Sequence, residues 1–336
     1  MNRSDQAIPN EIVNCVKTLE NAGFEAYLVG GCVRDIFLGK KPKDWDITTN
    51  AKPQNIQAIF PKTVYENTFG TVAVVNEEVT DETLKIVEIT PYRTETTYSD
   101  RRHPDQVKFS DSINDDLKRR DFTVNAIAIS LSNGAIKDVI DLYGGISDIN
   151  AKILRTVGDP VERFTEDALR MMRAVRLSVE LDFTCNKDTV LAIQSHNSLI
   201  KDVSMERVRD EFSRIIMSEQ PKLGLEMLSV FGLLQHIIPE IELGKGVAQP
   251  QAHAYDVWEH LLRTLQHSAD KSYSLDMRLS ALFHDIGKPK TKGFSRVTNQ
   301  PTFYSHEIVG SRETRKILER MKFSRGTIDK VVKMVR

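Results

Sequence analysis

The stretch Leu28-Val-Gly-Gly-Cys-Val-Arg-Asp-Ile-Phe-Leu-Gly39 decides how the first part of the chain folds. Its opening apolar run predicts a strand that ends at Gly30-Gly31, and the residues after the two glycines predict a helix. Two glycines let the backbone approach a ligand closely, and the free N–H groups at the start of a helix favour an anion. Arg34 lies one turn into that helix, where its guanidinium suits a bidentate contact with phosphate. We therefore expect Gly30, Gly31 and Arg34 to bind phosphate.

A pair of carboxylates follows in Lys43-Asp-Trp-Asp-Ile-Thr48. Residues i and i+2 of a strand share one face, so we expect Asp44 and Asp46 to project to the same side. Neighbouring carboxylate oxygens are ligands that Mg²⁺ prefers, and two such ions are used at phosphoryl-transfer sites. Either piece alone is compatible with an ordinary glycine turn or a solvated strand end. The two pieces together, in this order, favour a phosphoryl-transfer site.

Composition limits the class of protein and its surroundings. The chain has 336 residues, which suggests two or three domains, and 40% hydrophobic with 28% charged residues excludes wholesale disorder. The mean hydropathy is −0.33, and no apolar run approaches the ~18 residues that a membrane span needs. The polar N-terminus lacks a secretory signal, and Cys15, Cys32 and Cys185 are scattered without CxxC spacing. We expect a cytoplasmic protein without a membrane. At a net charge of −1, any polyanion site must be a local patch.

The chain changes character near residue 150. Before it, strand-like runs cover residues 26–29, 72–75, 84–89 and 136–139, and a helical pattern between Ile12 and Leu19 is closed by Gly23. After Asp159-Pro160, a good helix start, helical patterns take over. The fold class is therefore multi-domain: an α/β part followed by an all-α part. We expect domains at 1–150, 151–243 and 244–336, and because the chain stops inside an expected helix, we expect it to lack C-terminal residues.

Five ordered motifs resemble those of the class II tRNA nucleotidyltransferases, the CCA-adding enzymes, and of their relatives the bacterial poly(A) polymerases. The first combines Gly30-Gly-x-Val-Arg-Asp35 with Asp44-x-Asp46, typical of polymerase-β-type nucleotidyltransferase heads. The others are Arg119-Arg-Asp-Phe-Thr-Val-Asn-Ala126, Asp141-Leu-Tyr-Gly-Gly145, Glu166-Asp-Ala-Leu-Arg-Met-Met-Arg173 and Ser204-Met-Glu-Arg-Val-Arg-Asp-Glu211. The resemblance implies a nucleotidyltransferase head followed by a helical neck and body.

The resemblance also implies roles for residues of the head. Asp44 and Asp46 would hold two Mg²⁺ ions, and Gly30, Gly31 and Arg34 would bind the incoming triphosphate. Glu88 would be a third catalytic acid, although an acid at a strand edge would look the same. The remaining nucleotide-binding residues would be Arg120 for phosphate and Asp121 and Asn125 for a ribose hydroxyl; Asp121 is also placed to cap a helix over residues 122–128.

The fourth motif would read the base. Asp167 and Arg170 lie at i and i+3 of the helix expected after Pro160, with Arg173 on the same face and Glu166 steadying the pair. A carboxylate beside a guanidinium imitates a Watson–Crick partner for the exocyclic amine and ring nitrogen shared by cytosine and adenine. An ordinary surface ion pair would have the same spacing.

Two further features concern RNA. A basic cluster near the fourth motif predicts a surface for tRNA phosphates, and its members are Lys152, Arg155, Arg163, Arg170, Arg173 and Arg176. The polar segment 93–106 predicts a mobile loop. Members of the family that add only CC lack much of this loop, so its presence disfavours CC-only addition but does not separate complete CCA addition from A-only addition.

A second constellation lies near the C-terminus. His260, the pair His284-Asp285 and His306 resemble the pattern of HD-domain metal phosphohydrolases. Imidazoles and a carboxylate suit a transition metal, so His260, His284 and Asp285 form a candidate second metal site. Asp329 is poorly placed to supply the usual final acidic ligand.

The resemblance predicts an enzyme that adds C and A to the tRNA 3′ end without a template, from CTP and ATP, releasing pyrophosphate. The alternatives are A-only addition, a poly(A) polymerase, an HD-type phosphohydrolase acting on RNA ends, or an inactive RNA-binding protein. No obligate protein partner is expected.

Overall fold

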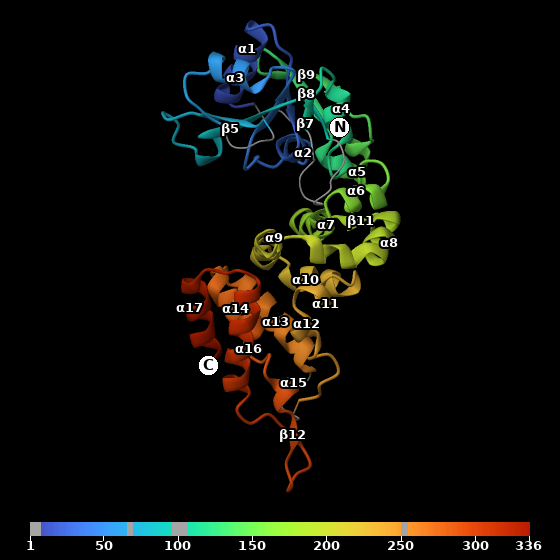
Figure 1. Cartoon of the computed structure of the whole chain (residues 1–336), viewed down its shortest axis with the longest axis vertical. Helices are drawn as coiled ribbons and strands as arrows, with labels where there is room; N and C mark the ends of the chain where they lie inside the picture. The colour runs from blue at the N-terminus through green and yellow to red at the C-terminus, as the bar shows by residue number, and fades with distance from the viewer. Residues whose placement is uncertain (1–7, 66–69, 96–106, 250–254) are drawn as a thin grey trace. The chain divides into compact units, whose positions relative to one another are not determined.

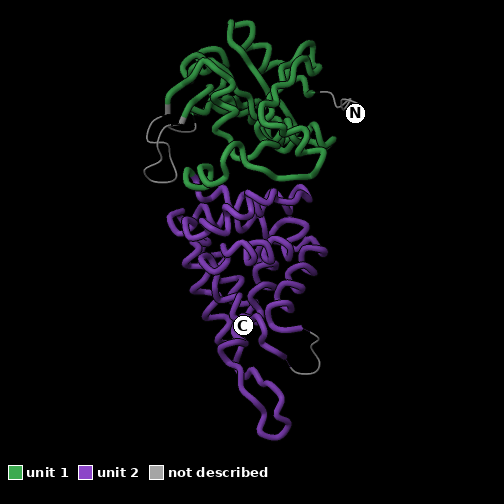
Figure 2. The backbone as a smooth tube through the Cα atoms, turned by 90° about the vertical axis from the view of Figure 1, so that its right-hand side faces the viewer, with its two compact units in different colours: residues 1–166 green, residues 167–336 purple. Residues whose placement is uncertain are grey.

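A computed structural model of the chain describes residues 8–65, 70–95, 107–249 and 255–336 (Figure 1). The chain divides into two compact units, residues 1–166 and residues 167–336 (Figure 2). The first unit is built on a mixed sheet and the second is mostly helical, as expected for an α/β part followed by an all-α part. The domain boundaries expected near residues 150 and 243 stay predictions.

The first unit contains a seven-stranded sheet. The spatial order is β3 (Thr63–Tyr65), β4 (Val72–Val75), β5 (Ile86–Pro91), β2 (Asp46–Thr49), β1 (Ala26–Val29), β8 (Ala128–Ser132) and β9 (Ala135–Ile140). Strands β2 and β5 run parallel with Asp46 opposite Glu88, whereas the other neighbours run antiparallel. The predicted strands at 26–29 and 72–75 are confirmed, and β5 begins two residues after the expected start because Glu82–Leu84 form a 3-10 turn.

The helices of this unit are α1 (Asn10–Asn21), α2 (Gly31–Phe37), α3 (Pro53–Ile59), α4 (Ile113–Lys118), α5 (Gly145–Ala151) and α6 (Pro160–Glu166). The predicted first helix is confirmed, since α1 buries Ile12 and Leu19 completely. Asp159 caps α6 as expected, because its Oδ1 accepts from the backbone N–H groups of Val161 and Glu162 at 2.8 and 3.0 Å. A two-residue strand, β10 (Ile153–Leu154), lies between α5 and α6.

Two local predictions are wrong, and a third differs from the structure at its start. Asp44 lies outside β2, which begins at Asp46, so the two aspartates do not share one strand. Asp121 does not cap a helix over 122–128; a 3-10 turn, η2 (Thr123–Asn125), is followed by strand β8. The expected loop 93–106 begins as a strand, β6 (Arg93–Glu95), paired with β7 (Val107–Phe109), while residues 96–106 lie outside the described residues.

Turn η2 is held by close packing against α5. A Cβ atom on Gly145 would lie 2.3 Å from the carbonyl oxygen of Thr123 and 2.8 Å from Cγ1 of Ile127. Only glycine allows this approach, and Thr123 Oγ1 also donates to Asp148 Oδ2 of α5 at 2.7 Å. The third motif therefore supports the turn that carries Asn125.

The second unit is a series of packed helices: α7 (Leu169–Leu181), α8 (Lys187–His196), α9 (Met205–Met217), α10 (Pro221–Val230), α11 (Leu234–Ile237), α12 (Pro239–Glu242), α13 (Val257–Asp270), α14 (Leu275–Phe283), α15 (Lys288–Thr291), α16 (His306–Arg320) and α17 (Arg325–Val335). Short pieces accompany them: β11 (Thr184–Cys185), the 3-10 turn η3 (Asn197–Asp202), β12 (Gly293–Phe294) and β13 (Pro301–Thr302). Helix α10 packs on α7 and α13, and α14 packs on α13 and α17.

A buried arginine joins two of these helices. Arg278 of α14 donates to the carbonyl oxygens of Ile216 and Ser218 at the end of α9, at 2.9 and 2.8 Å, and to that of Tyr273 at 3.0 Å. Carbonyls at the end of a helix have no partner within that helix, so one guanidinium satisfies several of them at once. This contact fixes the start of α14, whose other end carries His284 and Asp285.

Candidate functional site

The glycine turn after β1 brings three separate segments of the first unit together. Gly30 has φ +84° and ψ −140°, a conformation that residues with a side chain avoid. A Cβ atom there would lie 3.1 Å from Asp46 Oδ2 and 3.2 Å from Arg120 Nη1. One glycine thus lies against a carboxylate from β2 and a guanidinium from the second motif. Gly30 and Asp46 were predicted from the first motif and Arg120 from the second, and the fold places all three at one point.

Three acids determine the electrostatics at this point. Asp46 is partly buried, and Glu88 lies opposite it in the parallel pair β2–β5. Burial raises the pKa of Asp46 to about 7, with the charges of Glu88 and Asp44 adding to the effect and that of Arg120 opposing it. A proton or a cation is therefore favoured there near neutral pH. Hard carboxylate oxygens with unbalanced negative charge are the donor set of a divalent cation such as Mg²⁺.

Arg120 is held by a residue that the sequence reasoning missed. Asp116 of α4 is fully buried and accepts from Arg120 Nη2 at 3.0 Å and from Arg119 Nε and Nη2 at 2.9 and 2.6 Å. Burial alone would raise the pKa of Asp116, but the two guanidinium groups hold it below its usual value. The Nε atom of Arg120 is buried and has no hydrogen-bond partner among the described residues. The i, i+3 and i, i+4 spacing of Asp116 with two arginines was the available signal.

Arg34 and the second motif are joined by hydrogen bonds. Arg34 Nη1 donates to Asn125 Oδ1 at 2.7 Å, and Asn125 Nδ2 donates to Asp121 Oδ1 at 3.3 Å. Asp35 fixes the other edge of the Arg34 guanidinium at 2.8–2.9 Å. A Cβ atom on Gly31 would lie 3.5 Å from Arg34 Nη2 and 3.7 Å from Asp44 Oδ1. The fold therefore gathers the head residues predicted to bind the nucleotide.

In the second unit, the predicted base-reading residues are arranged differently from the expectation. Asp167 precedes α7 rather than lying on one continuous helix with Arg170, and its Oδ1 accepts from the backbone N–H of Leu169 at 3.1 Å. Its Oδ2 accepts from Arg207 Nη2 of α9 at 2.7 Å. The other terminal nitrogen of Arg207, Nη1, is buried and has no hydrogen-bond partner in the described part of the chain. The sequence analysis did not name Arg207, although it lies in the fifth motif. In the first turns of α7, Arg170 is buried and Arg173 is half-buried.

The predicted basic surface is wrong in one clear case. Arg176 is only 4% exposed, and its guanidinium donates to Glu211 at 2.6 Å and to Glu180 at 2.7 Å. A buried, doubly paired arginine stabilises the packing of α7 on α9 and is not available to RNA phosphates. Two other members of the cluster, Arg155 and Arg163, are paired with Asp148 and Glu166. The sequence shows the charges but not the partners that the fold supplies.

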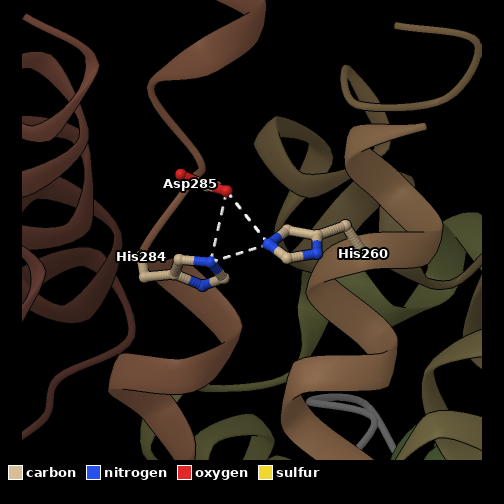
Figure 3. Close-up of side chains that lie close together, drawn as sticks. All are labelled: His260, His284 and Asp285. Carbon is tan, nitrogen blue, oxygen red and sulfur yellow. Dashed lines mark hydrogen bonds and ion pairs between the residues drawn. The ribbon is translucent and has the colours of Figure 1, made fainter. Parts of the chain in front are cut away.

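The C-terminal constellation forms a compact group that we call the histidine–aspartate cluster: His260, His284 and Asp285 (Figure 3). His260 is on α13, and the other two follow α14. The two Nε2 atoms lie 3.0 Å apart, and Asp285 Oδ2 lies 3.1 Å from that of His260 and 3.2 Å from that of His284. Neighbouring ligands of one ion with bonds of about 2.1 Å are separated by roughly 3.0 Å at right angles. The cluster therefore has the spacing of a metal site.

A lysine and a third histidine contact the same carboxylate. Lys288 Nζ lies 2.7 Å from Asp285 Oδ2, and His306 Nε2 lies 3.3 Å from Oδ1. Burial raises the pKa of Asp285, but hydrogen bonds from His260, His284 and Lys288 more than offset that and hold it well below the usual value. The carboxylate is therefore ionised at neutral pH, as a metal ligand must be. Lys288, 8% exposed, was missed by the sequence reasoning.

Three parts of the chain match known domain families. Residues 26–155 match the Poly A polymerase head domain, residues 182–243 match the "Probable RNA and SrmB- binding site of polymerase A", and residues 257–336 match the HD domain. These matches, with the glycine turn and the carboxylates, define a polymerase-type nucleotidyltransferase head joined to a helical region and an HD domain.

Individual proteins define the family more closely. The CCA-adding enzyme of Leuconostoc mesenteroides is 38% identical over 285 residues, 81% of this chain and 69% of that enzyme, and that of Levilactobacillus brevis is 45% identical over 222 residues, 66% of this chain and 53% of that enzyme. The crystal structure of the Bacillus stearothermophilus CCA-adding enzyme in complex with CTP has a TM-score of 0.67 and 31% identity, covering 95% of this chain and 67% of that one. The chain belongs to the family of CCA-adding enzymes.

CCA-adding enzymes are nucleotidyltransferases that use divalent metals. The chain spans about half the length of several of the curated relatives that it matches. No helix in the described ranges is long and apolar enough to cross a membrane.

The raised pKa of Asp46 predicts how cation binding depends on pH. A cation needs the ionised carboxylate, and with a pKa of about 7 most Asp46 side chains are protonated at pH 6 and ionised at pH 8. The apparent affinity for Mg²⁺ should therefore rise by roughly tenfold between these pH values. Calorimetric titration of a His284→Ala variant measures this without the histidine–aspartate cluster. Adding Asp46→Asn should remove the pH dependence, and an equal affinity at both pH values would contradict the assignment.

Proposed function

We propose that this chain adds C and A nucleotides to the 3′ end of tRNA without a nucleic-acid template, from CTP and ATP, releasing pyrophosphate. One observation carries the proposal: a Cβ atom on Gly30 would lie 3.1 Å from Asp46 Oδ2 and 3.2 Å from Arg120 Nη1, so these three residues meet at the end of β1, in a member of this family. A backbone that approaches this closely leaves space for a triphosphate beside a carboxylate and a guanidinium. The CTP bound in the B. stearothermophilus enzyme supports the same nucleotide class.

Asp44 and Asp46 are proposed to hold two Mg²⁺ ions, with Glu88 as the third catalytic acid. Bound Mg²⁺ would activate the attacking 3′-hydroxyl and stabilise the charge that develops on the leaving pyrophosphate. Arg120, kept in place by Asp116, lies beside Gly30 as Asp46 does and is suited to a phosphate oxygen. Arg34, held by Asp35 and Asn125, presents a second guanidinium to the same nucleotide.

The sugar and the base would be recognised by different residues. Asn125 and Asp121 form a hydrogen-bonded pair that suits a ribose hydroxyl. Asp167 would accept from the exocyclic amine of cytosine or adenine, while Arg170 or Arg207 donates to the ring nitrogen, and Arg173 lies on the same helix. The unpartnered Nη1 of Arg207, beside Asp167, supports its inclusion. Guanine and uracil present the opposite pattern at these atoms and would be rejected.

The first prediction tests the head carboxylates. Asp44→Ala and Asp46→Ala should each reduce nucleotide addition by more than a thousandfold, because metal stabilisation of transition-state charge is worth several kcal/mol. Affinity for tRNA should stay within about twofold, since it depends mainly on basic residues. Single-turnover assays with tRNAs ending in the discriminator base, in C or in CC distinguish complete CCA addition from A-only addition. The exposed strand residue Asp138 offers a control, Asp138→Ala, which should retain full activity. Addition within about tenfold of wild type in Asp46→Ala would contradict the proposed mechanism.

A second prediction concerns nucleotide choice. Asp167→Ala should lose CTP and ATP incorporation together and should weaken discrimination against UTP and GTP, because one protein edge serves both bases. Arg207→Ala should impair both nucleotides in the same way, whereas Asp210→Ala, an exposed acid on the same helix, should not. Incorporation of all four nucleotides on matched primers measures the effect. Loss of ATP use with unchanged CTP use would show that the two bases are read by different residues.

The histidine–aspartate cluster favours a second activity, a metal-dependent phosphohydrolase acting on phosphate esters of RNA. Its support is the spacing of three ligand atoms at 3.0–3.2 Å in a segment matching the HD domain. His260, His284 and Asp285 would hold one transition-metal ion, with His306 and Lys288 beside the same carboxylate. The cytoplasmic location expected from the scattered cysteines stays a prediction; all three are unpaired and buried.

Metal analysis tests this second assignment. Purified protein should bind about one Mn²⁺, Ni²⁺ or Zn²⁺ at the cluster, and the double substitution His284→Ala and Asp285→Ala should abolish that binding. The control is His267→Ala, an exposed histidine on the same helix as His260, which should leave the metal content unchanged. Nucleotide addition should be largely unaffected by the double substitution, because the head has its own carboxylates. A folded double variant that no longer extends tRNA would show that the two sites are coupled.

A further inference from the structure

A β-hairpin interrupts the helices of the second unit between α15 and α16. Strands β12 and β13 pair antiparallel, with Gly293 opposite Thr302 and Phe294 opposite Pro301. Figure 1 shows this hairpin extending away from the neighbouring helices, and Figure 2 shows the same projection from the side. Neither the proposed polymerase residues nor the histidine–aspartate cluster accounts for it.

The hairpin segment has basic and aromatic side chains but no acidic ones. Between Lys288 and His306 the sequence has three lysines and arginines and no carboxylate. Lys290 is paired with Glu313, but Lys292 and Arg296 are exposed and have no acidic partner in the part of the chain that the structure describes. Two large aromatic side chains lie among these cations: Phe294 is 61% exposed and Tyr304 is 81% exposed. Lys292 Nζ lies 5.9 Å from the centre of the Phe294 ring.

Exposed aromatic rings interleaved with unpaired cations are the combination that binds single-stranded nucleic acid. Bases stack on the rings with little dependence on sequence, and the cations follow the phosphates. A double helix would not fit this requirement, because its bases are already stacked on one another. An acidic protein segment would pair with the cations but would not offer flat groups that stack on the aromatic rings.

Both ends of the hairpin are joined to the carboxylate of the histidine–aspartate cluster. Lys288, before the hairpin, contacts Asp285 Oδ2 at 2.7 Å, and His306, after it, contacts Oδ1 at 3.3 Å. Close packing reinforces the junction, since a Cβ atom on Gly287 would lie 2.1 Å from the carbonyl oxygen of His306. The base of the hairpin therefore lies next to the proposed metal site, and a nucleic acid bound along the hairpin could extend to that site.

We propose that the β12–β13 hairpin binds single-stranded RNA, with bases stacked on Phe294 and Tyr304 and phosphates bound by Lys292 and Arg296, and so brings RNA to the histidine–aspartate cluster. The proposal rests on the proposed phosphohydrolase function of that cluster for its purpose, but RNA binding by the hairpin is tested independently of it. The substrate class of the cluster is then a single-stranded RNA segment rather than a free nucleotide.

Binding and crosslinking of a short single-stranded RNA test the proposal. A fluorescent RNA of about ten nucleotides carrying 4-thiouridine is titrated by anisotropy and then photocrosslinked to the full chain, and the adduct is located by peptide mapping. We expect adducts within residues 293–304. The double variant Phe294→Ala and Tyr304→Ala should lose the adducts in this segment and weaken binding at least about tenfold if the hairpin is the main site for such an RNA. Lys292→Ala with Arg296→Ala should lower the salt dependence of binding, reducing the slope by roughly one.

Val297 provides the matched control. It is 94% exposed at the hairpin tip but has neither a ring nor a charge, so Val297→Ser should leave RNA binding and crosslinking unchanged. If Val297→Ser instead weakens a concentration-dependent association of the chain seen by light scattering, while the aromatic variants retain their RNA adducts, the hairpin is a protein contact and the proposal is wrong. Wild-type adducts in the aromatic double variant would overturn it as well.

Two further measurements separate this proposal from the proposed function. The aromatic double variant should keep the metal content of the cluster and normal nucleotide addition, since it changes neither set of residues. The His284→Ala variant should lose metal but keep the RNA adducts on the hairpin. Loss of metal-dependent hydrolysis with intact adducts would refute the proposed activity of the cluster alone, whereas absence of adducts in wild-type protein would refute the hairpin proposal alone.

Discussion

The repulsion between neighbouring carboxylates is the constraint around which the head is organised. Asp46 and Glu88 are opposite residues of two parallel strands, and the charge of Asp44 acts on the same point. Such a group is stable only with a proton, a guanidinium or a metal ion close by. The fold supplies one positive charge through Arg120, which Asp116 keeps in place, and the remaining deficit is what a divalent cation would fill. Because Gly30 has no side chain, Asp46 and Arg120 can both lie close to its backbone.

The second unit also has a buried carboxylate at its candidate site, but different residues surround it. Asp285 is a single buried carboxylate. Four nitrogen-bearing side chains contact it: His260, His284, His306 and Lys288. Imidazole nitrogens in place of oxygens change the preferred ion from a hard cation such as Mg²⁺ to a transition metal. The two proposed sites consist of separate residues and would prefer different metals, as two reactions in one chain would require. The hairpin between Lys288 and His306 would give the second site an RNA substrate.

Burial explains where reasoning from charge alone failed. Arg176 and Arg278 have the side chain typical of RNA-binding sites, yet Arg176 is paired with Glu180 and Glu211 and Arg278 with carbonyl oxygens. Removing either guanidinium would leave buried acceptors unsatisfied, so these arginines contribute to stability. In contrast, Lys292 and Arg296 remain exposed and without acidic partners among the described residues. The difference lies in the surroundings of each charge.

The sequence by itself determined the fold class, the glycine turn and the family, because these depend on local spacing: two glycines before a helix, and five motifs in order. Helix α1 and the start of α6 followed from periodicity and from Asp159-Pro160 for the same reason. Only the tertiary structure decided which charges meet. Asp116 with Arg120, Arg207 with Asp167 over a separation of 40 residues, and Lys288 with Asp285 depend on how helices and strands pack, since a contact between distant segments has no local signature in the chain.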